Sequence, residues 1–236
     1  MDLLIKGSTE LNKMFAALQN TAAGLRRDFG EVENLQQSLK SARDFVAKAS
    51  ARIEESILND LILVRPNAGL LTPNVSKPGD GRDEFVLALS GAANFVRGNP
   101  HFAISLALRV NGETKIGLIY SPINERLYYA ESESGAYVFS TYHSERIRVS
   151  NLKEPTDLTI AYNTNGIRPM ISGVARESGC PAMDLAWVAA GKLDAFVSDP
   201  IDFAEFAAGE LLVRESGGQI FDNGGDLIAT NGHVEL

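Results

Sequence analysis

The stretch MDLAWVAAGKLDAF at residues 183–196, followed by AAGELLVRESGG at residues 207–218, decides the fold of this 236-residue chain. In both stretches an apolar run at helical spacing stops at glycine, and a short apolar segment follows. The predicted order is helix 181–190, strand 194–198, helix 204–215 and strand 219–222. Helices that alternate with strands in this way and cover mixed sheets indicate a layered α/β sandwich.

Short apolar or alternating runs dominate the part of the chain that precedes these stretches. Turn signals such as Asn111-Gly112, Ser121-Pro122 and Ser134-Gly135 separate these runs. Consecutive strands joined by short turns pair antiparallel, so this region is predicted to form a meander. The predicted strands are 102–110, 115–120, 126–130, 136–139, 146–149 and 158–162.

The first sixty residues have helical rather than strand periodicity. Apolar residues recur at intervals of three and four from Leu11 to Leu25 and again from Phe45 to Val64, which predicts two amphipathic helices. Pro66 is expected to end the second helix. The polar segment 73–83, rich in Gly, Pro and Asp, is predicted to be a mobile loop.

Length and composition narrow the class of protein. The chain has 44% hydrophobic residues and a net charge of −8, typical of a globular protein and unfavourable for binding nucleic acid or an anionic membrane. Its one cysteine, Cys180, excludes an internal disulfide. No signal peptide or membrane-spanning run is recognised, so a cytoplasmic location is expected. The chain is expected to be a single domain, 1–236, with approximate halves 1–150 and 151–236.

Several motifs occur in a fixed order: LALSGAANF at 87–95, NFVRGNP at 94–100, GLIYSP at 117–122, and the two stretches quoted first. Together they resemble the inositol monophosphatase family, in particular its bacterial extragenic-suppressor branch, from about Phe45 to Asn231. The resemblance implies an αβαβα sandwich shared with sugar bisphosphatases. It also implies a phosphatase that uses clustered Mg²⁺ ions to hydrolyse phosphate monoesters, and a homodimer.

The residues that would bind the metal depart from the family pattern. The family's Asp-Pro-Leu-Asp-Gly-Thr-Thr-Asn-Phe aligns with LALSGAANF, so that both acids are lost. By resemblance, the site positions are Ser50, Pro73, Asn74, Leu87, Ser90, Gly91, Ala92, Ala93 and Glu205. Only Glu205 keeps a carboxylate, and one carboxylate cannot hold paired Mg²⁺ ions, which require several oxygen ligands. The nearby loop acids Asp80, Asp83 and Glu84, and Asp202, are the only candidates for replacement ligands.

The remaining reactive residues do not form a recognisable catalytic motif. Ser90 lacks the two flanking glycines of a nucleophile elbow. The histidines His101, His143 and His233 are scattered, and no base can be chosen among them. Cys180 opens a predicted helix, where a thiolate would be stabilised. The backbone amides of residues 90–93, from Ser90 to Ala93, could attract an anion at a helix start.

Three hypotheses follow from the sequence. The first is a catalytically inactive family member that acts through a homodimer or through another protein and needs no cofactor. The second is a Mg²⁺-dependent phosphatase acting on inositol monophosphate or a related sugar phosphate. The third is a metal-free module that binds a small phosphate metabolite at Ser90–Ala93.

Overall fold

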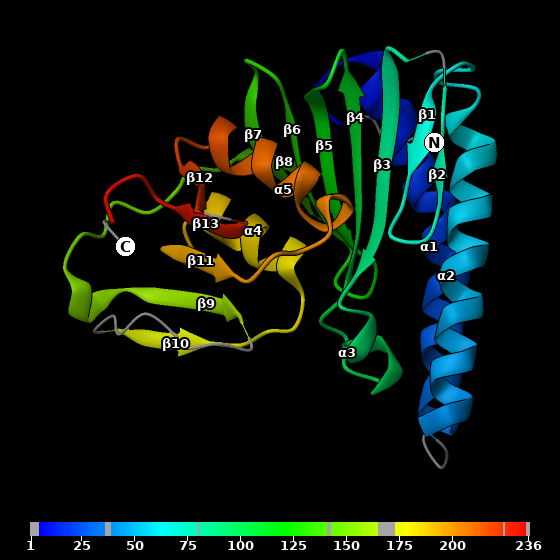
Figure 1. Cartoon of the computed structure of the whole chain (residues 1–236), viewed down its shortest axis with the longest axis horizontal. Helices are drawn as coiled ribbons and strands as arrows, with labels where there is room; N and C mark the ends of the chain where they lie inside the picture. Colours follow the sequence, from blue (N-terminus) through cyan, green and yellow to red (C-terminus); the bar gives the residue numbers. More distant parts are fainter. Residues whose placement is uncertain are drawn as a thin grey trace.

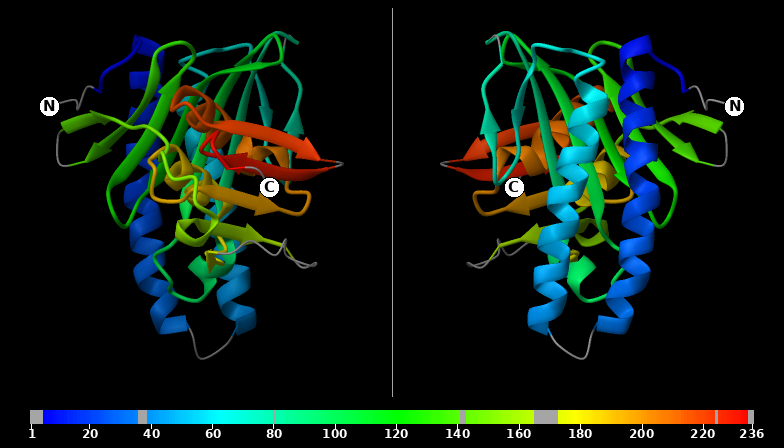
Figure 2. Two further views of the ribbon diagram at one scale, coloured as in Figure 1. Left: turned by 90° about the vertical axis from the view of Figure 1, so that its left-hand side faces the viewer. Right: turned by 90° about the vertical axis from the view of Figure 1, so that its right-hand side faces the viewer.

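The computed structural model describes residues 5–35, 39–79, 81–140, 143–164, 173–223 and 225–234. Two long helices, α1 (Thr9–Leu35) and α2 (Leu39–Leu61), begin the chain. They pack side by side against one face of a large sheet (Figure 1). Figure 2 shows that both helices extend beyond the sheet at one end. The two amphipathic helices predicted from periodicity are confirmed.

The large sheet has eight strands in the order β2-β1-β3-β4-β5-β6-β7-β8. From β3 to β8 every neighbouring pair is antiparallel, which confirms the predicted meander. The strands are β1 (Gly69–Leu71), β2 (Ser76–Lys77), β3 (Asp83–Ser90), β4 (Ala103–Val110), β5 (Glu113–Ser121), β6 (Arg126–Glu131), β7 (Gly135–Ser140) and β8 (His143–Arg146).

Two sequence predictions in this region are wrong. The segment predicted as a loop at 73–83 contains β2, because its backbone pairs with β1. The strand predicted at 146–149 ends at Arg146, since the Ile147 N–H donates to the Ala136 carbonyl but residues 147–150 form no further ladder. Both errors concern sheet-edge strands, where pairing depends on a neighbour that is distant in sequence.

The second half of the chain builds a five-stranded sheet in the order β10-β9-β11-β13-β12. Its strands are β9 (Thr159–Asn163), β10 (Val174–Arg176), β11 (Ala195–Ser198), β12 (Gln219–Asn223) and β13 (Asp226–Thr230). Helices α4 (Pro181–Ala189) and α5 (Phe203–Glu215) lie between the two sheets (Figure 1). The short helix α3 (Ala92–Val96) follows β3, and the 3-10 turn η1 (Pro155–Asp157) precedes β9.

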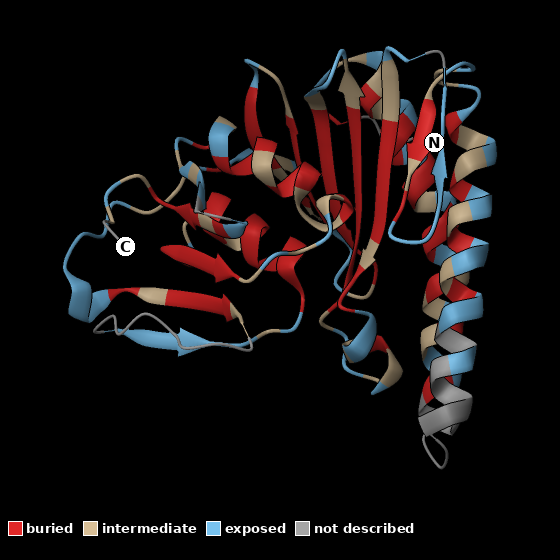
Figure 3. Ribbon diagram, in the orientation of Figure 1, coloured by how far each residue is buried: buried red, intermediate tan, exposed pale blue. Residues whose placement is uncertain are grey.

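These elements stack in layers: α1 and α2, the large sheet, α4 and α5, then the small sheet. Figure 3 shows the buried residues concentrated between the layers. One apolar cluster joins α1 and α2 to the sheet, and a second joins both sheets through α4 and α5. The layered α/β sandwich predicted from the sequence is confirmed. Among the described residues no α-helix covers the outer face of the small sheet, and segment 165–172 lies outside those residues.

Close contact between α4, α5 and the large sheet depends on glycine. A Cβ atom on Gly209 of α5 would lie 2.6 Å from Cβ and Cδ1 of Leu185 on α4. A Cβ atom on Gly117 of β5 would lie 2.8 Å from the Ala208 carbonyl oxygen. The missing side chains therefore allow α5 to pack tightly on both neighbours.

Replacing Gly209 with alanine is expected to lower the free energy of unfolding by about 1–3 kcal/mol, because overpacking outweighs the better helix propensity of alanine. Urea unfolding of the variant measures this loss. Gly24→Ala on α1 is the matched control, since nothing lies within 4 Å of a Cβ atom there. The control should gain up to about 1 kcal/mol from helix propensity. Equal effects at both positions would contradict the packing explanation.

Candidate functional site

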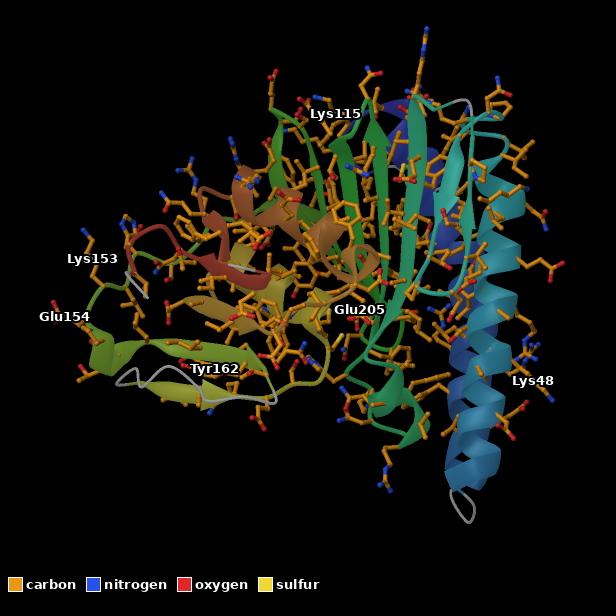
Figure 4. All side chains as sticks on the ribbon, viewed as in Figure 1. Lys48, Lys115, Lys153, Glu154, Tyr162 and Glu205 are labelled. Carbon is orange, nitrogen blue, oxygen red and sulfur yellow. The ribbon has the colours of Figure 1, made fainter. Side chains whose placement is uncertain are left out.

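Ser90 and Glu205 meet where β3 ends and α5 begins. The Ser90 hydroxyl donates to Oε2 of Glu205 over 2.9 Å and accepts the Ala182 N–H over 3.2 Å. Ser90 is completely buried, and the Glu205 label in Figure 4 lies between the large sheet and the second half of the chain. This one hydroxyl therefore connects β3, α4 and α5.

Local backbone features place both side chains. The Asp202 side chain caps α5 by accepting the Ala204 N–H over 2.8 Å, which puts Glu205 in the first helical turn. Gly91 follows Ser90 with φ of 82°, and a Cβ atom there would lie 2.9 Å from the His101 carbonyl oxygen. Only glycine fits this left-handed turn without strain. The turn ends β3 directly after Ser90.

The environment of Glu205 favours its neutral form. Burial raises the pKa of the Glu205 carboxyl above its ordinary value, and the negative charge of Asp202 adds to that increase. The hydrogen bond from Ser90 opposes the shift but does not cancel it.

Leu87 has no direct connection to this contact. Residues along a strand alternate between its faces, so Leu87 and Ser90, three residues apart, point to opposite sides of β3. Leu87 is 1% exposed and packs in the apolar cluster against α1 and α2. Its side chain offers no donor atom to any ion.

Three other positions implied by the resemblance lie on different elements. Ser50 is half-buried on α2, while Pro73 and Asn74 are exposed in the turn between β1 and β2. The Asn74 N–H donates to the Thr72 hydroxyl over 3.2 Å. Within the described residues, no hydrogen bond joins these three positions to Ser90 or Glu205.

The loop acids named as replacement ligands are engaged elsewhere. Asp83 forms an ion pair with Arg65, and Glu84 forms one with Arg109 over 3.0 Å. Asp83 begins the eight-residue strand that Ser90 ends, which separates their backbones by roughly 23 Å. Asp80 lies outside the described residues. The described loop acids are therefore at the wrong end of β3 to complete a site at Glu205.

The structure offers few features that would hold an anion at the site predicted for Ser90–Ala93. Helix α3 has only five residues, and no side chain caps its start. The Ser90 hydroxyl already has two partners, and the Asn94 amide donates to the carbonyls of His101 and Ser178 over 2.8 Å each. Such a short helix supplies a weak dipole for holding phosphate.

The donor set at this site does not fit Mg²⁺. The ion prefers six oxygen ligands in octahedral geometry, with carboxylates among them. The structure offers one buried carboxyl, Glu205, and one hydroxyl that donates to it, Ser90. Among the described residues, no three His, Cys, Asp or Glu side chains form a cluster suited to a metal.

The cysteine and histidine candidates have structural surroundings. Cys180 is buried, and burial raises the pKa of its thiol to about 12, so the helix start does not stabilise a thiolate there. His143 is largely exposed at the start of β8. The His233 N–H donates to the Asn231 side chain. The His101 ring packs against the Trp187 ring at 4.9 Å between centroids.

One buried acid was missed by sequence reasoning. Asp184, in the first turn of α4, is 1% exposed and accepts the Ser178 hydroxyl over 2.6 Å. Burial raises the pKa of the Asp184 carboxyl to about 7. It lines a cavity of about 370 Å³ together with Trp187 and Lys192. Its position on the buried face of an apolar helix was the available signal.

A second cavity lies on the far side of α5. It has a volume of about 420 Å³ and is lined by Arg109, Phe203 and Arg214, among others. The Arg109 guanidinium lies 4.7 Å from the centre of the Phe203 ring, and Arg214 pairs with Glu210 over 3.0 Å. Both arginines of this cavity therefore have acidic partners, Glu84 for Arg109 and Glu210 for Arg214.

Comparison with known proteins places these features in context. A model described as Inositol monophosphatase family matches residues 8–235. An inositol-1-monophosphatase of Rhizobium meliloti (strain 1021) is 34% identical, covering 96% of this chain and 93% of the relative. Nus factor SuhB of Pasteurella multocida is 32% identical, covering 95% and 89%. The crystal structure of extragenic suppressor protein suhB from Bartonella henselae superposes with a TM-score of 0.83 at 34% identity, covering 96% and 95%.

Proposed function

This chain belongs to the inositol monophosphatase family, on its extragenic-suppressor branch, and from that membership we propose that it is a non-catalytic member acting through another protein. The observation that carries the proposal is the contact between Ser90 and Glu205. Glu205, the one carboxyl left at the family's ligand positions, accepts a hydrogen bond from the Ser90 hydroxyl. Leu87, at a position where the family has an acid, is a buried apolar side chain.

A physical reason supports the loss of these acids as a group. Clustered carboxylates repel one another and resist burial unless a cation neutralises them. Leucine at position 87 and serine at position 90 remove that repulsion. A protein that does not use Mg²⁺ is therefore more stable with these residues than with the acids.

Interaction with a protein partner is the role we propose in place of catalysis. Relatives named Nus factor SuhB, at 29–32% identity, support it because that name describes a factor and not a hydrolase. We also propose a homodimer and a cytoplasmic location. No helix in the described part of the chain is long and apolar enough to cross a membrane. The net charge of −8 argues against direct binding of nucleic acid.

The proposal treats residues 1–236 as one working unit. The apolar cluster that includes Val86 and Ile119 of the large sheet also includes Phe196 and Leu227 of the small sheet. Helices α4 and α5 supply most of its remaining members. Because the two halves share this cluster, we propose that they fold and act together.

A Mg²⁺-dependent phosphatase is the second candidate. The names of the relatives favour it, since inositol-1-monophosphatases of two other bacteria are 34% and 35% identical to this chain over most of their length. Glu205 also retains a carboxyl at one ligand position. A phosphate-binding module at residues 90–93 is the third candidate, which the surroundings of α3 favour least.

Turnover separates the first two candidates. Purified protein with Mg²⁺ and inositol monophosphate is expected to release phosphate no faster than buffer. The Rhizobium meliloti relative, assayed alongside, tests the conditions. Phosphate release that Glu205→Ala abolishes would contradict the non-catalytic proposal and favour the phosphatase.

Thermal unfolding provides an independent measurement. A ligand specific for the folded state raises stability by about 2.7 kcal/mol at one hundred times its Kd. The melting temperature is expected to be the same in millimolar Mg²⁺ and in chelator. A rise with inorganic phosphate alone would support the binding module instead.

A further inference from the structure

Four side-chain polar atoms in the described part of the chain are buried without a hydrogen-bond partner, and two of them lie close to the junction of the two halves. They are Nε2 of His101 and Oδ1 of Asp184. An unsatisfied buried polar atom costs about 1–3 kcal/mol, so native structures rarely leave one alone. Two such atoms in one small region call for a common explanation.

Contacts from both sides bring these residues together. His101 packs on Trp187, which follows Asp184 by three residues and so lies on the same face of α4. The Asn94 amide donates to the carbonyls of both His101 and Ser178. Ser178 in turn donates its hydroxyl to Oδ2 of Asp184 over 2.6 Å. Asn94 therefore fixes the backbone beside each residue.

The two unsatisfied atoms are chemically complementary. A protonated carboxyl has one O–H to donate, and a neutral imidazole has one nitrogen to accept it. We infer that His101 and Asp184 form a hydrogen-bonded pair holding a single proton, which latches the turn after α3 to the start of α4. Since neither atom has a direct partner, the bond passes through one water molecule, which the cavity of about 370 Å³ that Asp184 lines can supply. This inference does not depend on the proposed function.

The surroundings favour the neutral form of both partners. Burial raises the pKa of Asp184 to about 7 and lowers the pKa of His101. The charged groups that line the cavity together with Asp184 are Arg176, Glu177 and Lys192. Lys192 is directed toward the Tyr128 hydroxyl at 3.5 Å. Burial is the largest cause of both shifts.

The latch is expected to depend on pH. Below about pH 6 the Asp184 carboxyl keeps its proton and the pair is neutral, because its pKa is raised to about 7. As pH rises through that value, the pair loses its proton and leaves a buried negative charge. The midpoints belong to the pair and not to either residue alone.

Nitrogen NMR of ¹⁵N-histidine-labelled protein tests the inference. The chain has three histidines, and the signal lost in His101→Gln identifies His101. Between about pH 5 and 9, its Nε2 is expected to remain an unprotonated acceptor and to shift once, when Asp184 ionises. Asp184→Asn should abolish that step, because the amide cannot titrate, and leave the curves of His143 and His233 unchanged.

Two outcomes would overturn the pair. One is a His101 titration curve that is identical in Asp184→Asn and in the wild type. The other is an Nε2 that carries its own proton at neutral pH. If Asp184→Asn fails to fold, His101→Phe provides an alternative test, since phenylalanine keeps the ring contact with Trp187. The measurement is then the pH titration of the ¹³C signal of the Asp184 carboxyl. Its midpoint should move from the wild-type value, and an unchanged midpoint contradicts the pair.

Discussion

Leu87→Asp is expected to lower the free energy of unfolding by about 4–5 kcal/mol near neutral pH, close to the upper end of measured single-residue effects. Leu87 is 1% exposed in the cluster between the large sheet and α1 and α2, so the variant loses apolar burial and buries an unpaired charge. At acid pH the carboxyl becomes neutral and the loss should be smaller. Urea unfolding at two pH values measures both effects.

Leu87→Met is the matched control. It keeps an apolar side chain of similar volume, and such changes usually cost less than about 1.5 kcal/mol. Addition of Mg²⁺ should restore neither variant, because Glu205 is held by Ser90 and Leu87 lies in an apolar cluster among the described residues. A specific recovery of Leu87→Asp by Mg²⁺ would mean that the remaining donors can hold the ion, contrary to the proposed function.

The free energy of unfolding of Asp184→Asn, relative to that of the wild type, is expected to be higher at alkaline pH than at acid pH. The folded-state pKa of about 7 lies above the unfolded value of 3.8, so the folded wild-type protein binds more protons than the unfolded chain between these values. The stability that the Asp184 carboxyl contributes to the wild-type protein is fully present below the unfolded-state pKa. It is lost as pH rises through the folded-state pKa. About three pKa units correspond to about 4 kcal/mol.

The measurement is the difference in free energy of unfolding between variant and wild type at about pH 4, 6 and 8. This difference should move in favour of Asp184→Asn as pH rises, and it cancels contributions from all other titrating groups. Glu55→Gln, an exposed change on α2, is the control and should give a constant difference. A flat profile for Asp184→Asn would show that its carboxyl is ionised in the folded protein at neutral pH.

These two variants address separate features of the molecule. Leu87→Asp tests whether the apolar replacement at a family ligand position is required for stability without metal. Asp184→Asn tests a buried acid that belongs to α4 and not to the inherited ligand positions. Results that supported one prediction and contradicted the other would therefore remain interpretable.

Local periodicity was sufficient to predict most of the fold. The apolar spacing of α1 and α2, the turns between β4 and β7, and the glycines after α4 and α5 each act over a few residues. The sequence did not predict β1, β2, β3, β10 or β13, and the strand that it placed at 146–149 lies at His143–Arg146. Among the unpredicted strands, β1, β2 and β10 have three residues or fewer. Strands this short carry no pattern of their own and exist only because a neighbouring strand pairs with them.

The candidate site was predictable in part. Glu205, Ser90 and Leu87 could be selected by aligning short motifs, because those motifs are continuous in sequence. Their arrangement could not be predicted. Nothing in the sequence indicated that the Ser90 hydroxyl donates to Glu205, 115 residues away, while accepting from Ala182. Asp184 was overlooked because its burial arises from packing between α4 and its neighbours.

The sequence by itself determined the family and the order of most helices and strands, and by resemblance it predicted that acids are absent from the family's ligand positions. These depend on residue types and short spacings, which are present in the unfolded chain. Only the tertiary structure decided that Glu205 accepts a hydrogen bond from the Ser90 hydroxyl, and that the pKa of the Asp184 carboxyl is raised to about 7. Burial and hydrogen bonding between distant segments set the charge of an acid, and both exist only after the two sheets close around α4 and α5.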